Sequence, residues 1–368
     1  TSFLENKNYK FNKENILTQL PEKFIDEAIE AISSWDNYAP TPLIKLNKLN
    51  DELKLKNIYY KDEDKRFELK SFKALGGAFA VYKIASEKKN ITVSTATAGN
   101  HGRSVAWGAQ RLGLKCKIFI SEFVSESRAE AMRNLDAEVI RVKGNYDNSL
   151  KECIEQSNKN NWEIVQDVSW EGYKEVPKLI MAGYTIMVKE IIDEINKNSI
   201  THVFLQAGVG GMAAAMIAGF AKLSENIPQF IIIEPENADC VFQSIKNNKP
   251  TTVDIKKETV MGGMSCGDVS SIAWEILKNS ANYCLTIPDE AISTAVALLA
   301  EKRLSNEKII GGECAVPGVI ALIGAFNNKE YLDKLKLNSE SNVLLFGCEG
   351  LTDDAMYQKL LNDGLQKI

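Results

Sequence analysis

The chain has 368 residues, of which 45% are hydrophobic and 25% charged, and its formal net charge is -5. This length predicts two domains, or one large domain with an insertion, with enough chain to bury a full core. The acidic charge argues against a nucleic-acid partner, which favours a basic surface. No stretch reaches the roughly 18 apolar residues of a membrane span, and residues 1–30 lack the apolar core of a signal peptide. We therefore expect a cytoplasmic protein that contacts neither membrane nor nucleic acid.

Cysteine and histidine usage limits the metal and disulfide chemistry. The seven cysteines are scattered and form no C-x-x-C pair, which is typical of reduced, mostly buried thiols. Only His101 and His202 are present, so a histidine-based zinc site is not expected. We predict no bound metal.

Strand-like and helix-like segments alternate along the chain. In chain order we predict a strand at 57–60, a helix at 72–88 that Ser71 is placed to cap, a strand at 91–95, a helix at 104–112, a strand at 116–120, a helix at 127–135, and strands at 137–142 and 203–206, then a helix at 212–223 and strands at 230–233 and 342–346. Repeated strand–turn–helix units predict an α/β fold with mainly parallel sheets. Ligands of such sheets bind beyond the carboxyl ends of the strands.

Lys73 stands at the start of the first predicted helix, among Phe72, Ala74 and Leu75. A lysine that is desolvated there has a lowered pKa, so its amine can attack an aldehyde. Most lysines are solvated and have no such role. Whether Lys73 is a reactive lysine therefore depends on the segments that follow.

Small residues and glycines occupy the segment 94–103, directly after a predicted strand. Glycines there let the backbone approach a ligand closely, and backbone N–H groups in such a turn can receive a carboxylate. The amide of Asn100 can donate to a phenolate oxygen. The alternative is a tight connection in which His101 is a packed, hydrogen-bonded histidine.

A glycine turn at 206–213 follows an apolar strand and opens an apolar helix. The N–H groups and the dipole at such a helix start bind phosphate. The same residues fit G-x-G-x-x-A, and Glu234 stands near the spacing of a ribose-binding acid. A nicotinamide or flavin enzyme is therefore an alternative, as is a turn that serves packing alone. Two later segments, 311–318 and 346–354, carry polar side chains that can line a pocket at strand ends.

Together these segments resemble the fold-type II pyridoxal phosphate (PLP) enzymes, which include serine and threonine dehydratases, tryptophan synthase β and cysteine synthase. T-P-L at 41–43, S-F-K-x-x-G-G at 71–77, G-N-H-G at 99–102, the glycine turn and C-E-G at 348–350 occur in the order of that group. Within it the chain is most similar to the diaminopropionate ammonia-lyases. The motifs that carry this similarity are R-F-x-L-x-x-F-K-x-L-G-G-A at 66–78, T-A-T-x-G-N-H-G-R at 95–103, Q-D at 166–167, W-E-G-Y at 170–173, A-G-V-G at 207–210 and E-P-x-x-A-D-C at 234–240.

The resemblance implies the fold and the role of each site residue. Lys73 would hold PLP as a Schiff base and remove the Cα proton, with Asp167 as the second catalytic residue. The implied cofactor-binding residues are Lys73, Asn100, Gly208, Val209, Gly210, Gly211, Met212, Glu313 and Cys348, and the implied substrate-binding residues are Thr97, Ala98, Gly99, His101 and Tyr173. The fold would consist of two three-layer α/β domains, a large one of residues 1–81 and 177–368 and a smaller inserted one of residues 82–176. The protein would form a homodimer.

The chain departs from this resemblance at two places. The ammonia-lyases carry an aspartate where this chain has Ala98, and alanine cannot move a proton. Either Lys73 then moves protons on only one side of the cofactor ring, and the enzyme takes one enantiomer, expected to be L, or the substrate is not diaminopropionate. The second departure is Cys314 after Glu313 and Cys348 near the C-terminus, where serine and threonine are usual. A neutral serine or threonine beside the pyridine nitrogen of PLP leaves that nitrogen unprotonated. A thiol is a weaker hydrogen-bond donor, so cysteine should do the same.

The predicted function is a PLP-dependent carbon–nitrogen lyase that converts 2,3-diaminopropionate to pyruvate and ammonia. The alternatives are a PLP enzyme that eliminates the β-substituent of serine, a cysteine conjugate or a threonine-like substrate, a dinucleotide-dependent enzyme built on Gly208, Gly210 and Glu234, and a non-catalytic amino-acid-binding protein. The leaving group, the enantiomer, the oligomer size and any need for a monovalent cation are left open.

Overall fold

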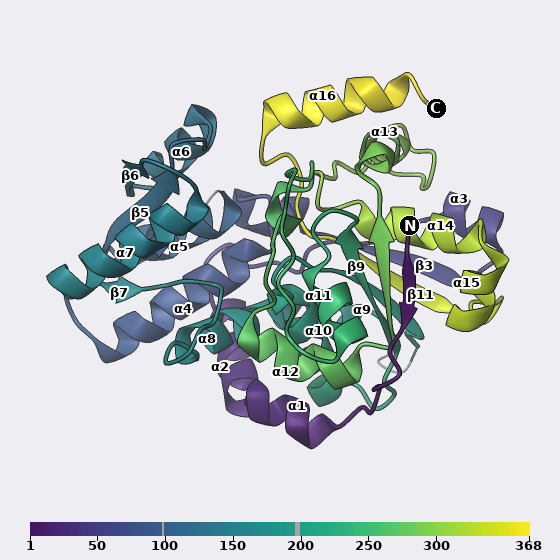
Figure 1. The fold of residues 1–368 in the computed structure, drawn as a ribbon, viewed down its shortest axis with the longest axis horizontal. Coiled ribbons are helices and arrows are strands. Elements are labelled where there is room, and N and C mark those ends of the chain that lie inside the picture. The colour runs from purple at the N-terminus through teal and green to yellow at the C-terminus, as the bar shows by residue number, and fades with distance from the viewer. Residues whose placement is uncertain (98, 196–198) are drawn as a thin grey trace. The chain divides into compact units, whose positions relative to one another are not determined.

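The computed structural model describes residues 1–97, 99–195 and 199–368 (Figure 1). The described residues form two compact units. The first unit comprises Thr1–Glu22, Pro40–Lys70 and Met187–Ile368, and the second comprises Lys23–Ala39 and Ser71–Ile186. The domain boundaries expected from the sequence stay a prediction.

A seven-stranded sheet forms the core of the first unit. Its strand order is β1 (Phe3–Glu5), β10 (Tyr283–Ile287), β9 (Gln229–Pro235), β8 (His202–Gln206), β11 (Asn342–Gly347), β3 (Asn57–Asp62) and β2 (Leu43–Lys45). The inner strands are parallel, and both edge strands are antiparallel to their neighbours. Strands β8 and β11 are buried along their whole length, as expected for parallel strands that helices cover on both faces.

Helices cover both faces of this sheet. They are α1 (Lys13–Gln19), α3 (Asn47–Leu53), the 3-10 helix η1 (Glu63–Glu68), α9 (Ile186–Glu194), α10 (Gly211–Leu223), α11 (Cys240–Asn247), η2 (Gly262–Met264), α12 (Ser271–Ser280), η3 (Asp289–Ala291), α13 (Ile292–Ala300), α14 (Pro317–Phe326), α15 (Lys329–Leu335) and α16 (Asp354–Leu365). Helix α14 packs across β8, β9, β10 and β11, and α10 packs on β8 and on α12.

A smaller, fully parallel sheet forms the core of the second unit. Its strand order is β6 (Glu138–Val142), β5 (Lys115–Ser121), β4 (Thr92–Ala96) and β7 (Glu163–Ile164). The helices of this unit are α2 (Glu22–Ser33), α4 (Lys73–Glu87), α5 (Asn100–Arg111), α6 (Glu126–Arg133), α7 (Tyr146–Asn160) and α8 (Glu175–Tyr184). Helices α5 and α7 pack on β4 and β5, and α4 packs on α5 and α8.

The predicted α/β class with mainly parallel sheets is confirmed. The predicted strands and helices occur within a few residues of their expected bounds. The largest difference is α5, which begins at Asn100 and not at residue 104. The capping position of α4 is Phe72 and not Ser71, although the Ser71 hydroxyl accepts the N–H of Lys73 at 3.3 Å.

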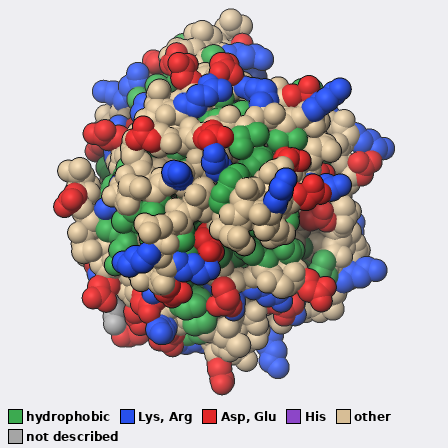
Figure 2. Space-filling model, turned by 90° about the vertical axis from the view of Figure 1, so that its left-hand side faces the viewer, with side chains coloured by type: hydrophobic (Ala, Val, Ile, Leu, Met, Phe, Trp, Pro, Cys, Tyr) green, Lys and Arg blue, Asp and Glu red, His purple; other side chains and the backbone are tan. Residues whose placement is uncertain are grey.

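The surface charge and the helices bear on contact with nucleic acid and with membranes. On the face shown in Figure 2, basic and acidic side chains are interspersed, in contrast to the single-signed field that steers nucleic acid. Within the described ranges, no helix combines the length and the apolar character that a bilayer crossing requires.

A buried charge cluster holds the segment that leads towards Lys73. The guanidinium of Arg66 donates to Glu63 and Glu190 at 2.8 to 2.9 Å, and Lys61 Nζ lies 2.7 Å from Glu190. Two cations and two carboxylates balance, as buried charges must. Burial alone would raise the pKa of Glu190, but Arg66 and Lys61 outweigh it and lower that pKa. Immediately after this cluster, Phe67 adopts a positive φ of 47°, a conformation that is costly for a non-glycine residue.

Glycines let α4 approach α5 and α8 at backbone distance. A Cβ on Gly76 would lie 2.5 Å from the carbonyl oxygen of Ile180, and one on Gly77 would lie 2.3 Å from Ser104 Oγ. From the facing helices, a Cβ on Gly108 would lie 2.7 Å from Ala78 Cα. Contacts this short leave no room for a methyl group, so these positions require glycine for packing.

We expect the variant Gly76→Ala to destabilise the protein by about 1–3 kcal/mol through overpacking, even though alanine favours a helix interior by about 1 kcal/mol. The matched control is Gly324→Ala in α14, where a Cβ would meet nothing within 4 Å. That change should leave the free energy of unfolding equal or higher. Urea unfolding of both variants measures the difference, and equal stability of the two would contradict the packing argument.

Candidate functional site

Lys73 is the first residue of α4, and its side chain is 25% exposed. Its Nζ lies 5.5 Å from the ring centre of Phe72 and 5.8 Å from that of Tyr184. The hydroxyl of Tyr184 is buried, and this burial raises the pKa of the phenol. The amine is thus held between aromatic rings and remains accessible, as expected for a reactive lysine.

Asp167 forms an ion pair with Lys73 through Oδ2. Burial raises the pKa of Asp167, but the neighbouring His101 and Lys73 outweigh it and hold that pKa well below its usual range. Asp167 comes from the loop after β7, and Lys73 comes from α4, so the sheet brings together two residues that are 94 positions apart. The structure therefore places the two predicted catalytic residues in direct contact.

His101 lies behind this pair, in the first turn of α5. Its Nε2 is 2.8 Å from the carbonyl oxygen of Val165, and its Nδ1 is 3.7 Å from Asp167 Oδ2. Burial lowers the pKa of His101, and the carboxylate of Asp167 raises it in part. His101 therefore lies beside Asp167, a predicted catalytic residue, and is itself only 5% exposed.

The loop that carries Asp167 is fixed by its neighbours. The Gln166 side chain accepts from Thr95 Oγ1 and the Ala96 N–H and donates to the Ala96 carbonyl oxygen, at 2.8 to 3.1 Å. The hydroxyl of Tyr173 accepts the Gln166 N–H and donates to the Ile164 carbonyl oxygen, both at 2.8 Å. These contacts tie the loop to β4, and the hydroxyl of Tyr173 fixes the backbone at residues 164–166.

The turn between β4 and α5 is organised by Thr97. Its hydroxyl accepts the N–H groups of Gly99 at 3.1 Å and Gly102 at 3.3 Å. Asn100 is the first residue of α5, so the N–H groups of the turn lie at a helix start, where an anion is favoured. The predicted substrate-binding residue Ala98 lies outside the described residues.

The glycine turn follows β8 in the first unit and leads into α10, which begins at Gly211. Gly210 has a left-handed φ of 88°, and a Cβ there would lie 2.8 Å from Leu277. A Cβ on Gly208 would lie 3.0 Å from the carbonyl oxygen of Gly263 and from Cys266 Sγ. Gly210 occupies the capping position and offers no side chain to the first turn of α10. The turn has the backbone shape and the helix start of a phosphate cradle, and the segment from Gly208 to Met212 fits that role.

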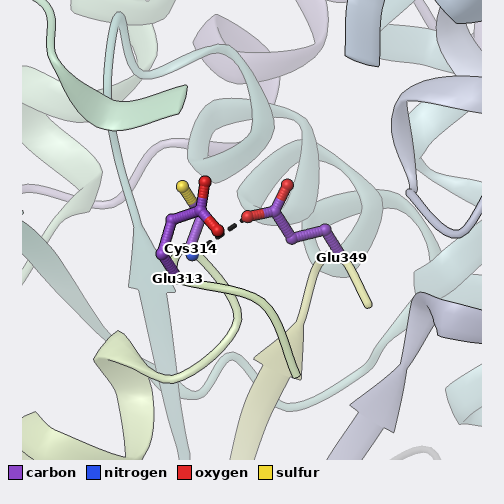
Figure 3. A group of neighbouring side chains, drawn as sticks. All are labelled: Glu313, Cys314 and Glu349. Carbon is purple, nitrogen blue, oxygen red and sulfur yellow. Dashed lines mark hydrogen bonds between the residues drawn. The ribbon is translucent and has the colours of Figure 1, made fainter. Parts of the chain in front are cut away.

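Two buried carboxylates and a thiol meet near the end of the chain (Figure 3). The ligand atoms of Glu313, Cys314 and Glu349 lie within 4.8 Å of one another, the one such group found among the described residues. The N–H of Cys314 already donates to Glu349 Oε1 at 3.0 Å, and burial raises the pKa of the Cys314 thiol. An acidic cluster without a further ligand-directed feature does not establish a metal site.

Cys348 and Gln206 share an acceptor beside this group. The thiol of Cys348 donates to the carbonyl oxygen of Cys314 at 3.1 Å, and Gln206 Nε2 donates to the same oxygen at 2.9 Å. The thiol proton of Cys348 is thus directed to the protein backbone. Gln206 Oε1 is buried and has no hydrogen-bond partner among the described residues, so it remains an open acceptor next to the glycine turn.

The position of Glu234 counts against a dinucleotide site. Its two carboxylate oxygens accept the N–H groups of Val241 and Phe242 at 2.8 and 2.7 Å. The residue is fully buried, and this burial raises its pKa to about 8. The carboxylate accepts N–H groups in the first turn of α11 and is not accessible to a ribose.

Each unit, taken by itself, contains groups that suit PLP. In the second unit an accessible amine pairs with a carboxylate. In the first unit a glycine turn leads into a helix start, and a buried amide oxygen remains an open acceptor. The sequence prediction missed Tyr184, Gln206 Oε1 and the contact between Cys314 and Glu349. Tyr184 lies in no motif, and its partner Phe72 is far from it in the sequence, so only the packing of α4 on α8 reveals it.

Comparisons with known proteins agree with this geometry. Residues 35–348 match the profile of the family described as pyridoxal-phosphate dependent enzyme. The diaminopropionate ammonia-lyase of Escherichia coli K12 is 34% identical over 351 residues, which cover 89% of this chain and 88% of that protein. Two crystal structures of the E. coli ammonia-lyase, with D-serine and with an aminoacrylate-PLP azomethine reaction intermediate, match with a TM-score of 0.91. They are 31% and 32% identical and cover 99% of this chain and 97% of each solved chain. The chain therefore belongs to the pyridoxal-phosphate dependent enzyme family.

Proposed function

We propose that this protein eliminates the β-amino group of 2,3-diaminopropionate and yields pyruvate and ammonia. The observation that carries the proposal is the ion pair between Lys73 and Asp167, in a chain similar to diaminopropionate ammonia-lyases over nearly its whole length. The elimination needs a base for the Cα proton and an acid for the departing amine. The two members of the pair supply one of each.

The cofactor is pyridoxal phosphate. When bound, PLP supplies the electron sink for the charge that develops at Cα. We assign its covalent attachment to Lys73 Nζ, its phosphate to the N–H groups of residues 208–212, and its ring hydroxyl to the amide of Asn100. We assign Glu313 and Cys348 to its ring, with the Cys348 proton directed to the backbone, so that the thiol does not protonate the ring nitrogen.

The residues of the second unit divide the proton transfers. Lys73 removes the Cα proton, and Asp167 gives a proton to the amine as it departs. We propose that the start of α5, which begins at Asn100, receives the substrate carboxylate. The hydroxyls of Thr97 and Tyr173 are engaged with the backbone, so direct substrate contacts through them stay predictions.

The first test replaces the lysine. Lys73→Ala should lose the visible absorbance of the covalently held cofactor and at least ~10³-fold of the turnover number. Lys83→Ala is the matched control, because Lys83 lies in the same helix and pairs with Glu27 away from the site. Absorbance spectra and pyruvate release measure both variants. Full activity of the Lys73 variant would refute the assignment.

The second test concerns the enantiomer. Because Ala98 stands where the ammonia-lyases carry an aspartate, we expect pyruvate release from L-diaminopropionate and not from the D-isomer. Ala98→Asp should add turnover of the D-isomer, because a carboxylate there can move a proton that alanine cannot. If the variant gains no D-activity, the missing carboxylate does not explain the selectivity.

A second candidate function follows from the same residue. Without a carboxylate at position 98, the site has one group fewer that favours a β-ammonium, and a relative of known structure binds D-serine. Another β-substituted amino acid, such as serine or a cysteine conjugate, is then the substrate. Activity towards serine or a conjugate, combined with none towards either isomer of diaminopropionate, would favour this candidate.

We also propose that the protein works as a homodimer in the cytoplasm. All seven cysteines are free thiols, and six of them are buried, as is typical of proteins from a reducing compartment. Light scattering coupled to size-exclusion chromatography should give twice the mass of one chain. The mass of a single chain would refute the dimer.

A further inference from the structure

The hydrogen bond of His101 Nε2 determines where the ring carries its first proton. Carbonyl oxygens only accept, so the contact of 2.8 Å with Val165 O requires a hydrogen on Nε2. Nδ1 then carries either a lone pair or the second proton. It is buried, has no hydrogen-bond partner among the described residues, and lies 3.7 Å from Asp167 Oδ2.

The groups around His101 have opposite effects on this second proton. Asp167 favours it, whereas burial and the ammonium of Lys73 oppose it. Asp167 also neighbours the phenols of Tyr173 and Tyr184, whose burial keeps them neutral. The charge on Lys73 is therefore the variable that decides whether Nδ1 is protonated.

Lys73 must lose a proton before its amine can act. An ammonium has no lone pair, so it can neither attach a cofactor nor remove the Cα proton. The nearest acceptor is Asp167 Oδ2, which contacts Nζ directly. Once Lys73 is neutral, the opposing charge has gone, and both Asp167 and His101 gain proton affinity.

We propose that His101 and Asp167 share, between Nδ1 and Oδ2, the proton that Lys73 releases, and that His101 thereby keeps Asp167 supplied with a proton for the departing amine. This inference rests on the proposed function and deepens it. His101 is a positioning residue, because it acts through Asp167 and does not touch the reacting atoms.

The proton count closes over one elimination. When the shared proton lies on His101, its Nδ1–H bond breaks as the O–H bond of Asp167 forms. That O–H bond then breaks as an N–H bond forms on the departing amine, and the C–N electron pair leaves with ammonia. The pair now lacks its shared proton, and the proton that Lys73 took from Cα passes to Oδ2 and restores the starting state.

The first experiment follows the imidazole nitrogens by ¹⁵N NMR in the PLP-loaded protein. The chain has only two histidines, and His202 is an internal control, because both of its ring nitrogens are bonded, to Thr201 Oγ1 at 2.7 Å and Leu335 O at 2.8 Å. In Asp167→Asn the titration midpoint of His101 should fall by at least about one pH unit, a tenfold loss of proton affinity, while His202 stays unchanged. Equal His101 midpoints in the two proteins would overturn the shared proton.

The second experiment measures the pH dependence of turnover in His101→Gln. A glutamine amide can keep the donor to Val165 O but cannot carry the extra proton. The proton must then stay on Asp167 alone and is lost at lower pH. We expect the basic limb of the kcat profile to move down by at least about one pH unit, whereas His202→Gln leaves it in place. A lower kcat with an unmoved profile would reduce His101 to a packing role and overturn the inference.

The two experiments separate this inference from the proposed function. The NMR titration needs no substrate. Coupled titration in a protein that is inactive towards diaminopropionate would refute the proposed function and support the shared proton. Activity towards diaminopropionate with uncoupled histidines would support the function and refute the shared proton.

Discussion

The close approach of α4 to α5 and α8 is the constraint on which the position of Lys73 and its neighbours depends. Helices meet at backbone distance there because Gly76 and Gly77 have no side chains. That packing brings the Tyr184 ring against Phe72 and fixes the first turn of α4, from which Lys73 projects. A methyl group at this interface would displace the helix start, and the ion pair with Asp167 tolerates little displacement because it is a direct contact.

The sequence predicted the helices and strands well. Buried parallel strands are continuous apolar runs, and the glycine turn after β8 has a composition that few other structures require. The purpose of Gly76 and Gly77 is visible only in the structure, where they lie inside a helix and serve packing. Glycine patterns indicate close approach, but they do not say whether a ligand or a neighbouring helix approaches.

What the sequence could not supply is the set of partners that sheet order creates. Asp167 reaches Lys73 because β7 is the neighbour of β4 and the loop after it is tied to that strand by Gln166. Likewise, Glu349 reaches the N–H of Cys314 across 35 positions. Hydrophobic periodicity reports only local neighbours along an element. Pairings between loops at strand ends depend on the strand order, which no local pattern encodes.

Because Ala98 has no carboxylate, the acid of the proposed reaction is Asp167, which pairs with Lys73. A single acid must be reprotonated for every turnover, and water reaches it poorly because its side chain is 15% exposed. A buried imidazole at 3.7 Å is the nearest source of that proton other than Lys73 itself. In the proposed reaction, the lack of a carboxylate at position 98 thus increases the dependence of the proton transfers on His101, which lies behind Asp167.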